Sequence, residues 1–232
     1  MIFFLVSVAF RLPAQQNEAD RRLLADVRTK AEKGDAQSQC DLGRAFDEGS
    51  LGVPRDRVEA VKWYRKAAEQ NYAEAQFYLG SCYDHGDGVA KDYVEAVKWY
   101  RKAAEQNYAT AQFNLGFCCV EGRGMAKDYV EAVKWIRKAA EQNFGPAQNS
   151  LGSLYEFGGM GVAKDYVEAY RWWLLVARQG DEPAKKDVRT LEGRMSREQI
   201  ANAQKLAQNF KPRSVPSAVS VIPGTGILEM RP

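Results

Sequence analysis

The residues of this chain that could take part in catalysis are few: one histidine, His85, and four cysteines, Cys40, Cys82, Cys118 and Cys119. A thiol beside an imidazole can act as a nucleophile, and a set of thiolates and imidazoles can bind zinc. Cys82 and His85 are three residues apart, so they would share one face of a helix. A hydrolytic, zinc or redox site in this chain would therefore centre on His85.

The spacing of these residues favours a structural role for the thiols. No two cysteines form the Cys-x-x-Cys pair of a zinc knuckle or the framework of a disulfide-rich protein. Cys82 and Cys118 occupy equivalent small positions of a repeated sequence, which is typical of buried free thiols. A single histidine also cannot supply a site that needs two imidazoles. We predict no catalytic residues, no cofactor and no metal site.

Two further patterns look like ligand sites and are better explained as parts of helices and turns. The glycine pairs Gly86/Gly88 and Gly122/Gly124 lack the Gly-Lys-Ser/Thr ending of a phosphate loop, so we interpret them as turn glycines. The Lys-Trp-Tyr-Arg-Lys runs, one of which spans residues 62–66, are flanked by glutamates, which is typical of a solvated helix face. The formal net charge is only +3, and we predict no binding to nucleic acid.

One unit of about 36 residues recurs along the chain. Leu-Gly begins at Leu42, Leu79, Leu115 and Leu151, and the motif Asp-x-Val-Glu-Ala begins at Asp56, Asp92, Asp128 and Asp165. Successive copies of either motif are 36 or 37 residues apart. Because self-similarity at such a period is the mark of stacked repeats, the chain is predicted to form about four units of one solenoid.

Each unit is predicted to contain two helices. The segment 92–105 places apolar residues at intervals of three and four, which predicts helix B, with Asp92 as N-cap and Glu95 completing a capping box. Asn107 follows as the left-handed residue that ends the helix. The segment 73–84 has the same spacing and predicts helix A. Two such helices cannot bury their apolar faces alone, so consecutive pairs must stack.

The chain on either side of the four units is less regular. Residues 17–210 are the predicted repeat domain, closed by a half-unit at 18–33 and by a final helix that begins after Ser196. Residues 1–16 are predicted to be a signal peptide or a disordered N-terminus, because they begin with an apolar run of signal-peptide length. This run favours a periplasmic or secreted protein over a cytoplasmic one.

Residues 211–232 are predicted to form a disordered tail, because they hold four of the eight prolines of the chain. The apolar run at 219–222 within them is either a short binding strand or an unstructured remnant. No segment of the sequence approaches the roughly 18 uninterrupted apolar residues of a spanning helix.

The order of the repeated motifs resembles a known family. Ala-x-Ala-Gln-x-x-Leu-Gly occurs at 73–80 and 109–116, and Gly-x-Gly-Val-x-x-Asp occurs at 86–92. This combination resembles the Sel-one-like repeat (SLR) family, a relative of tetratricopeptide repeats, over about residues 18–209. The resemblance implies an all-α fold, a right-handed α/α superhelical solenoid of about four helix-pair repeats plus terminal cap helices. It also implies that helix A residues line a concave surface.

Helix A positions that differ between units are the candidates for partner binding, because stacking does not dictate them. By analogy with tetratricopeptide geometry they face the concave groove. The candidates are Arg44, Asp47, Phe77, Ser81, Asp84, Phe113, Phe117, Val120, Asn149, Ser153 and Glu156. Phe113 and Phe117 lie one turn apart, and they either form an apolar anchor for a peptide or helix or pack against the adjoining helix.

The resemblance implies a non-catalytic scaffold or adaptor that presents its groove to a protein or peptide, with no small-molecule substrate. One alternative is an enzyme of the same repeat family, β-lactamase-like or a thiol- or metal-dependent hydrolase. No repeat here carries the cysteine pair of the family's cysteine-rich branch, which argues against the β-lactamase-like form. The other alternative is a structural spacer without a dedicated groove. Bound metal or acylation by a penicillin would support an enzyme.

Overall fold

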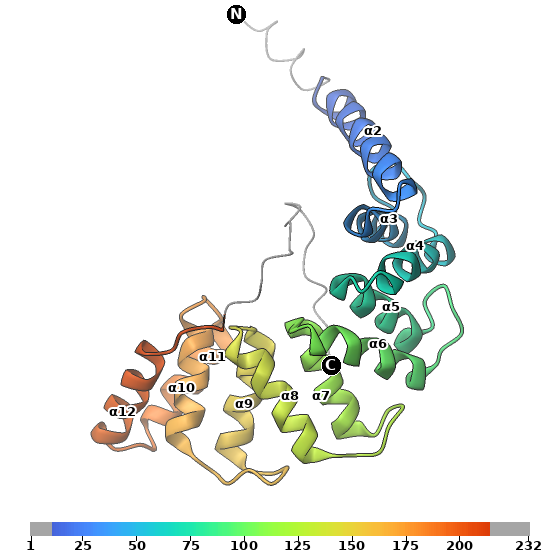
Figure 1. Ribbon diagram of the computed structural model, residues 1–232. Helices are drawn as coiled ribbons and strands as arrows, with labels where there is room; N and C mark the ends of the chain where they lie inside the picture. The colour runs from blue at the N-terminus through green and yellow to red at the C-terminus, as the bar shows by residue number, and fades with distance from the viewer. Residues whose placement is uncertain (1–10, 214–232) are drawn as a thin grey trace, which may run out of the picture.

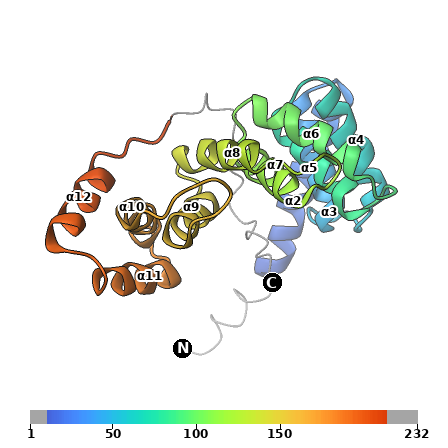
Figure 2. The same ribbon diagram turned by 90° about the horizontal axis from the view of Figure 1, so that it is seen from below.

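The computed structural model describes residues 11–213, and the regular elements within them are α-helices that follow one another in a curved stack (Figure 1). They are α2 (Arg11–Glu32), α3 (Ala36–Glu48), α4 (Arg57–Glu69), α5 (Ala73–His85), α6 (Tyr93–Glu105), α7 (Ala109–Glu121), α8 (Tyr129–Glu141), α9 (Gly145–Phe157), α10 (Tyr166–Ala177), α11 (Glu182–Glu192) and α12 (Arg197–Gln208). Each helix from α2 to α10 packs on the next, and α12 packs back on α10 (Figure 2). The predicted α/α solenoid is confirmed.

Four helix pairs form the body of the solenoid. Helix A of the four units is α3, α5, α7 and α9, and helix B is α4, α6, α8 and α10. At the first end α2 takes the place of a helix B, and it begins at Arg11, earlier than the half-unit predicted at 18–33. The start of the predicted signal peptide, residues 1–10, and residues 214–232 of the predicted tail lie outside the described residues. Across residues 11–213, no helix combines the length and apolar character needed to cross a membrane.

The predicted caps set the helix boundaries, with one correction. The N-cap aspartates of helix B accept a hydrogen bond from the backbone of the glutamate three residues later, as Asp92 does from Glu95 (3.0 Å). The return bond of the predicted capping box does not form, because the Asp92 backbone N–H donates to the carbonyl oxygen of Tyr83 (2.9 Å) and the Glu95 carboxylate pairs with Lys98 (2.5 Å). Asn107 has φ 65°, so the left-handed residue predicted at the end of helix B is confirmed.

A ladder of buried glutamines joins the units. The ladder glutamines on helix A are Gln39, Gln76, Gln112 and Gln148, and their partners after helix B are Gln70, Gln106, Gln142 and Gln179. Gln112 donates its side-chain amide to the carbonyl of Ala104, in the preceding helix B (3.0 Å). Its side-chain oxygen accepts a hydrogen bond from Gln142, which follows the next helix B (2.7 Å). Each ladder glutamine therefore ties a helix A to the helices on both sides of it.

Glycine allows two kinds of close approach between elements. Inside helix A, a Cβ on Gly80 would lie 2.8 Å from the Tyr100 ring, so glycine is needed where helices A and B cross. In the loop before α8, Gly124 has φ +65°, and a Cβ there would overlap the backbone carbonyl of Tyr93 at the start of α6. The glycine-rich loop of one unit thus rests on helix B of the unit before it, which confirms its interpretation as a turn.

Glu131 connects the helices B of the second and third units. Its carboxylate accepts hydrogen bonds from Arg101 of α6 (2.8 Å) and from the Trp135 indole of its own helix (3.0 Å). The bonds from Trp135 and Arg101 lower the pKa of the Glu131 carboxyl. A carboxyl whose pKa is lowered by folding stabilises the fold above its unfolded-state pKa, and this stabilisation is lost as the pH falls through the folded-state pKa.

We expect Glu131→Gln to lower the free energy of unfolding by about 1 kcal/mol at neutral pH, because the bonds to a charged acceptor are weakened. Chemical denaturation followed by circular dichroism should show this difference shrinking as the pH falls through the folded-state pKa of Glu131, because the wild-type carboxyl is then protonated too. Glu59→Gln is the matched control, since Glu59 pairs with the exposed Lys62 of its own helix and should matter little. A loss that is independent of pH would contradict the assignment.

Candidate functional site

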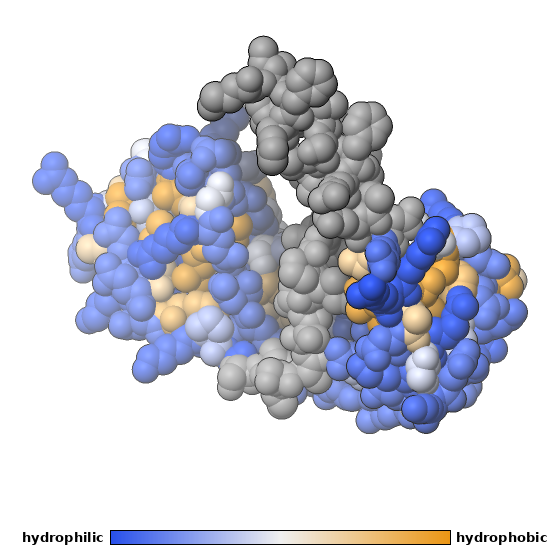
Figure 3. Space-filling view, turned by 90° about the horizontal axis from the view of Figure 1, so that it is seen from above, coloured by the Kyte–Doolittle hydropathy of each residue, from blue (hydrophilic) through white to orange (hydrophobic). Residues whose placement is uncertain are grey.

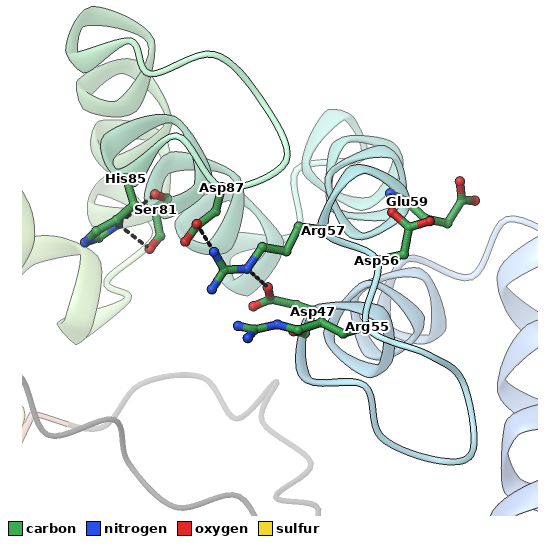
Figure 4. Close-up of polar contacts among 8 residues, drawn as sticks. All are labelled: Asp47, Arg55, Asp56, Arg57, Glu59, Ser81, His85 and Asp87. Carbon is green, nitrogen blue, oxygen red and sulfur yellow. Dashed lines mark hydrogen bonds and ion pairs between the residues drawn. The ribbon is translucent and has the colours of Figure 1, made fainter.

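His85 and the cysteines do not come together as a catalytic group. His85 is exposed at the end of α5, and its Nδ1 lies 2.9 Å from the carbonyl oxygen of Ser81. Its ring points away from the ion-paired Arg57 and Asp87 (Figure 4). All four cysteines are free and buried. Burial raises the pKa of the Cys82 and Cys118 thiols to about 12, so both stay protonated and are weak nucleophiles.

The structure also bears on the metal and nucleic-acid sites that were considered from the sequence. Within the described part of the chain, no three His, Cys, Asp or Glu residues are grouped so that they could hold a metal ion. The lysines of the basic and aromatic runs fold back on the tryptophans of the same helix. Lys66 lies over Trp63 (3.8 Å) and Lys102 lies over Trp99 (4.1 Å). These rings are covered by their own helix and are not presented as a stacking platform for bases.

Three of the candidate carboxylates form ion pairs inside the solenoid. The pairs are Asp47 with Arg57 (3.5 Å), Asp84 with Arg123 (3.8 Å) and Glu156 with Arg194 (2.7 Å). Each arginine comes from outside the helix A that carries the carboxylate: from helix B, from the next loop, or from the segment after α11. The side chains of Asp84 and Glu156 are only 11% and 10% exposed. All three carboxylates hold elements together, and Asp84 and Glu156 leave little surface for a partner, whereas the Asp47 side chain is 33% exposed.

The first of these pairs belongs to a larger cluster between the first two units. The Arg57 guanidinium lies between Asp47 and Asp87, the latter from the loop that follows α5 (Figure 4). Arg55 adds a hydrogen bond from its Nε to the backbone carbonyl of Asp47 (2.8 Å). The cluster therefore joins the helix pair of the first unit to the loop of the second unit.

Arg44, another candidate, also has internal partners. Its guanidinium contacts Asp41 of its own helix (2.9 Å) and Glu74 of the next helix A (3.7 Å). Burial raises the pKa of both the Asp41 and the Glu74 carboxyl, and the Arg44 charge opposes this shift. Arg44 thus bridges the helices A of the first two units.

The candidate aromatic residues divide into packed and open rings. Phe113 is 9% exposed and packs edge-on against Phe117 (4.9 Å between ring centroids) and Phe144 (5.5 Å). Phe117 is 45% exposed. Phe77 is partly buried against the rings of Tyr100 (5.9 Å) and Tyr108 (5.4 Å). Of the Phe113 and Phe117 pair, one ring therefore packs and the other is available to a partner.

The remaining candidates differ in how far they are exposed. Val120 packs partly buried beside Cys119, Asn149 and Ser81 are half-buried, and Ser153 is exposed. Ser81, Phe117 and Ser153 stand at equivalent positions of three successive units, and we call these three residues the open stripe. One large ring is thus flanked in the repeat register by two small polar side chains.

The sequence reasoning missed an exposed aromatic residue of helix A. Phe157 ends α9 and is 65% exposed. It stands where the preceding units carry His85 and Glu121, and an apolar residue at an otherwise polar position of the repeat would have been the signal to notice. The face of the molecule seen in Figure 3 is largely hydrophilic and carries separate hydrophobic patches. Phe157 is thus a second exposed aromatic ring on a helix A, in addition to Phe117 of the third unit.

Comparisons with known proteins agree with this architecture. The family model described as Sel1 repeat matches residues 36–72, 73–108, 109–144 and 145–181. Among curated proteins, an F-box protein of Arabidopsis thaliana is 41% identical over 59 residues, which are 25% of this chain and 16% of that protein. Chitin synthase regulatory factor 3 of Schizosaccharomyces pombe is 40% identical over 50 residues, which are 22% of this chain and 5% of that protein. The matched part is a small fraction of both relatives.

Two solved structures superpose over most of the chain. The first is c5321, described as a protective antigen present in uropathogenic Escherichia coli strains and displaying an SLR fold. It has a TM-score of 0.73 at 34% identity, over 88% of this chain and 45% of that one. A Sel1 repeat protein from Oxalobacter formigenes has a TM-score of 0.68 at 35% identity, over 85% of this chain and 84% of that one.

Proposed function

Since this chain belongs to the Sel1 repeat family, we propose that it is a non-catalytic scaffold that presents its helix A surface to a protein or peptide partner. Proteins of this family are commonly interaction scaffolds. The observation that carries the proposal here is the exposed ring of Phe117 on helix A of the third unit. Large aromatic side chains in such positions are frequent anchors of protein interfaces.

The surroundings of Phe117 suit an anchor. Phe113 supports the ring from the core side, and Phe144 in turn supports Phe113. A ring held in place before binding loses little conformational freedom when a partner arrives. Ser81 and Ser153 occupy the same repeat position on the flanking helices and are small, so they leave room for a partner's side chains beside the ring.

The side-chain chemistry supports a non-catalytic role over the hydrolase alternative. A thiol nucleophile acts as the thiolate, and burial raises the pKa of Cys119 to about 11 and that of the other three cysteines further. The spacer alternative makes a different prediction, since a spacer has no partner that depends on Phe117.

We expect Phe117→Asp to weaken partner binding by about tenfold or more, because a charge would replace an aromatic anchor. The measurement is affinity capture with the full chain followed by quantitative mass spectrometry. Val130→Asp is the matched control, because Val130 is 78% exposed at the start of a helix B. Both variants should keep the helical circular dichroism of the wild type. Phe113 is unsuitable for this test, since its burial would turn it into a test of folding.

Equal recovery of every captured protein by the wild type and by Phe117→Asp would remove the open stripe from the proposal and favour the spacer. Loss of the same partner in Val130→Asp would show that the effect is not specific to helix A.

A further inference from the structure

The last described residues run back along the solenoid. After α12 ends, Phe210 packs edge-on against the ring of Trp172 (5.9 Å). The backbone N–H of Arg213 then donates to the carbonyl oxygen of Glu141 (2.9 Å), and the Arg213 Nε lies 3.1 Å from the Glu141 carboxylate. Glu141 is the last residue of α8. The chain is therefore carried from the C-terminal cap to the end of helix B in the third unit.

An aromatic row begins beside this point. Phe144 follows Glu141 by three residues, and its ring contacts Phe113, which contacts Phe117. Two ring contacts therefore lie between Phe144, near the site where Glu141 binds Arg213, and the exposed ring of Phe117. The outer end of the row is apolar, and the other members of the open stripe, Ser81 and Ser153, are neutral.

The segment that follows Arg213 has the length and the composition to reach this ring. Nineteen residues, 214–232, come after it, and none from Ser214 to Leu228 carries a charge. The run Val219–Ile222, apolar except for Ser220, begins six residues beyond Arg213. Six extended residues span up to about 20 Å. An uncharged segment with an apolar run is therefore tethered beside an exposed ring with neutral neighbours.

We infer that the segment 214–232 docks on the open stripe of its own chain, with Val219–Ile222 against the Phe117 ring. This inference rests on the proposed function, because the segment would occupy the surface offered to an external partner. A short tether gives a local concentration on the order of millimolar, so even a weak contact is substantially occupied. The segment then acts as an internal competitor that only a tighter binding partner displaces.

The test uses the full chain with Phe117→p-benzoylphenylalanine, which keeps an aromatic ring and forms covalent bonds to its neighbours on illumination. Mass spectrometry of the digested protein should find crosslinks from position 117 to residues 214–232 within one molecule. Their yield should stay constant when the protein is diluted about tenfold, since a tethered contact does not depend on concentration. The same photoreactive residue at Val130 is the positional control and should not crosslink to this segment.

A second variant tests the run itself. Val221→Asp with Ile222→Asp in the same photoreactive chain should reduce the crosslink yield by about tenfold, and unchanged circular dichroism will show that the repeats are intact. Crosslinks that join two copies, or no crosslink to 214–232, would overturn the inference. If crosslinking fails while Phe117→Asp still loses its partner, self-docking is wrong and the proposed function stands.

Discussion

Gly124→Ala should lower the free energy of unfolding by about 3 kcal/mol or more, whereas Gly161→Ala should cost only about 1 kcal/mol. Both glycines have left-handed backbone, with φ +65° and +78°, so both substitutions carry the strain of a side chain in that region. At Gly161 the space around a new Cβ is empty within 4 Å, but at Gly124 the new atom overlaps the carbonyl of Tyr93. The difference between the two losses of unfolding free energy measures the overlap with the Tyr93 carbonyl, separately from the strain of left-handed backbone.

Guanidinium denaturation of the two variants, followed by circular dichroism, measures this difference. The wild-type slope against denaturant should be kept, so that the shift in midpoint reports stability alone. Equal losses for Gly124→Ala and Gly161→Ala would mean that the loop moves away at no cost. The packing of the third unit's loop on α6 would then contribute nothing to the stack.

Gln112→Leu is expected to lower the free energy of unfolding by about 3 kcal/mol, although leucine has a similar size and is more hydrophobic. Gln112 is fully buried, donates to Ala104 and accepts from Gln142. The substitution leaves a buried carbonyl and an amide without their partner. Each unsatisfied buried group costs roughly 1–3 kcal/mol, more than the gain from the added apolar surface.

Gln37→Leu provides the control for Gln112→Leu. Gln37 is an exposed residue of α3, so the same chemical change there should alter stability by less than about 0.5 kcal/mol. Thermal and chemical denaturation of both variants give the comparison. A Gln112→Leu protein as stable as Gln37→Leu would show that the buried ladder does not stabilise the junction between units.

The repeat and its helices were predictable because their boundaries depend on local residues. Asp92 caps α6 through a bond to a residue three positions away. Asn107 adopts the left-handed backbone that commonly ends a helix. Ser196 caps the start of α12, where the final helix was predicted to begin, and it forms a full capping box with Gln199. Such contacts join residues that are close in the sequence, so their spacing is enough to predict them.

The open part of helix A was harder to predict, because it depends on distant residues. Phe113 and Phe117 look alike in the sequence, and only the packing of Phe113 against Phe144 separates the buried ring from the exposed one. The capping box at Glu95 failed for a similar reason, since the backbone N–H of Asp92 donates instead to the carbonyl oxygen of Tyr83 in the preceding helix A.

The ion pairs of the candidate carboxylates were also hard to predict, because the partners can lie far apart in the sequence. Glu156 is paired with Arg194, 38 residues further along the chain. A sequence supplies the charges at these positions, but it does not supply the rotation of each helix that decides which charges meet.

The glutamine ladder also bears on how a gene for such a protein can change length. Gln112 bonds to a carbonyl eight residues before it and to Gln142, 30 residues after it, and Gln76 has the same two separations. An in-frame duplication of one 36-residue unit would therefore place an equivalent donor and acceptor on both sides of the new junction. Selection can lengthen or shorten the scaffold by whole units without first having to evolve a new interface between them.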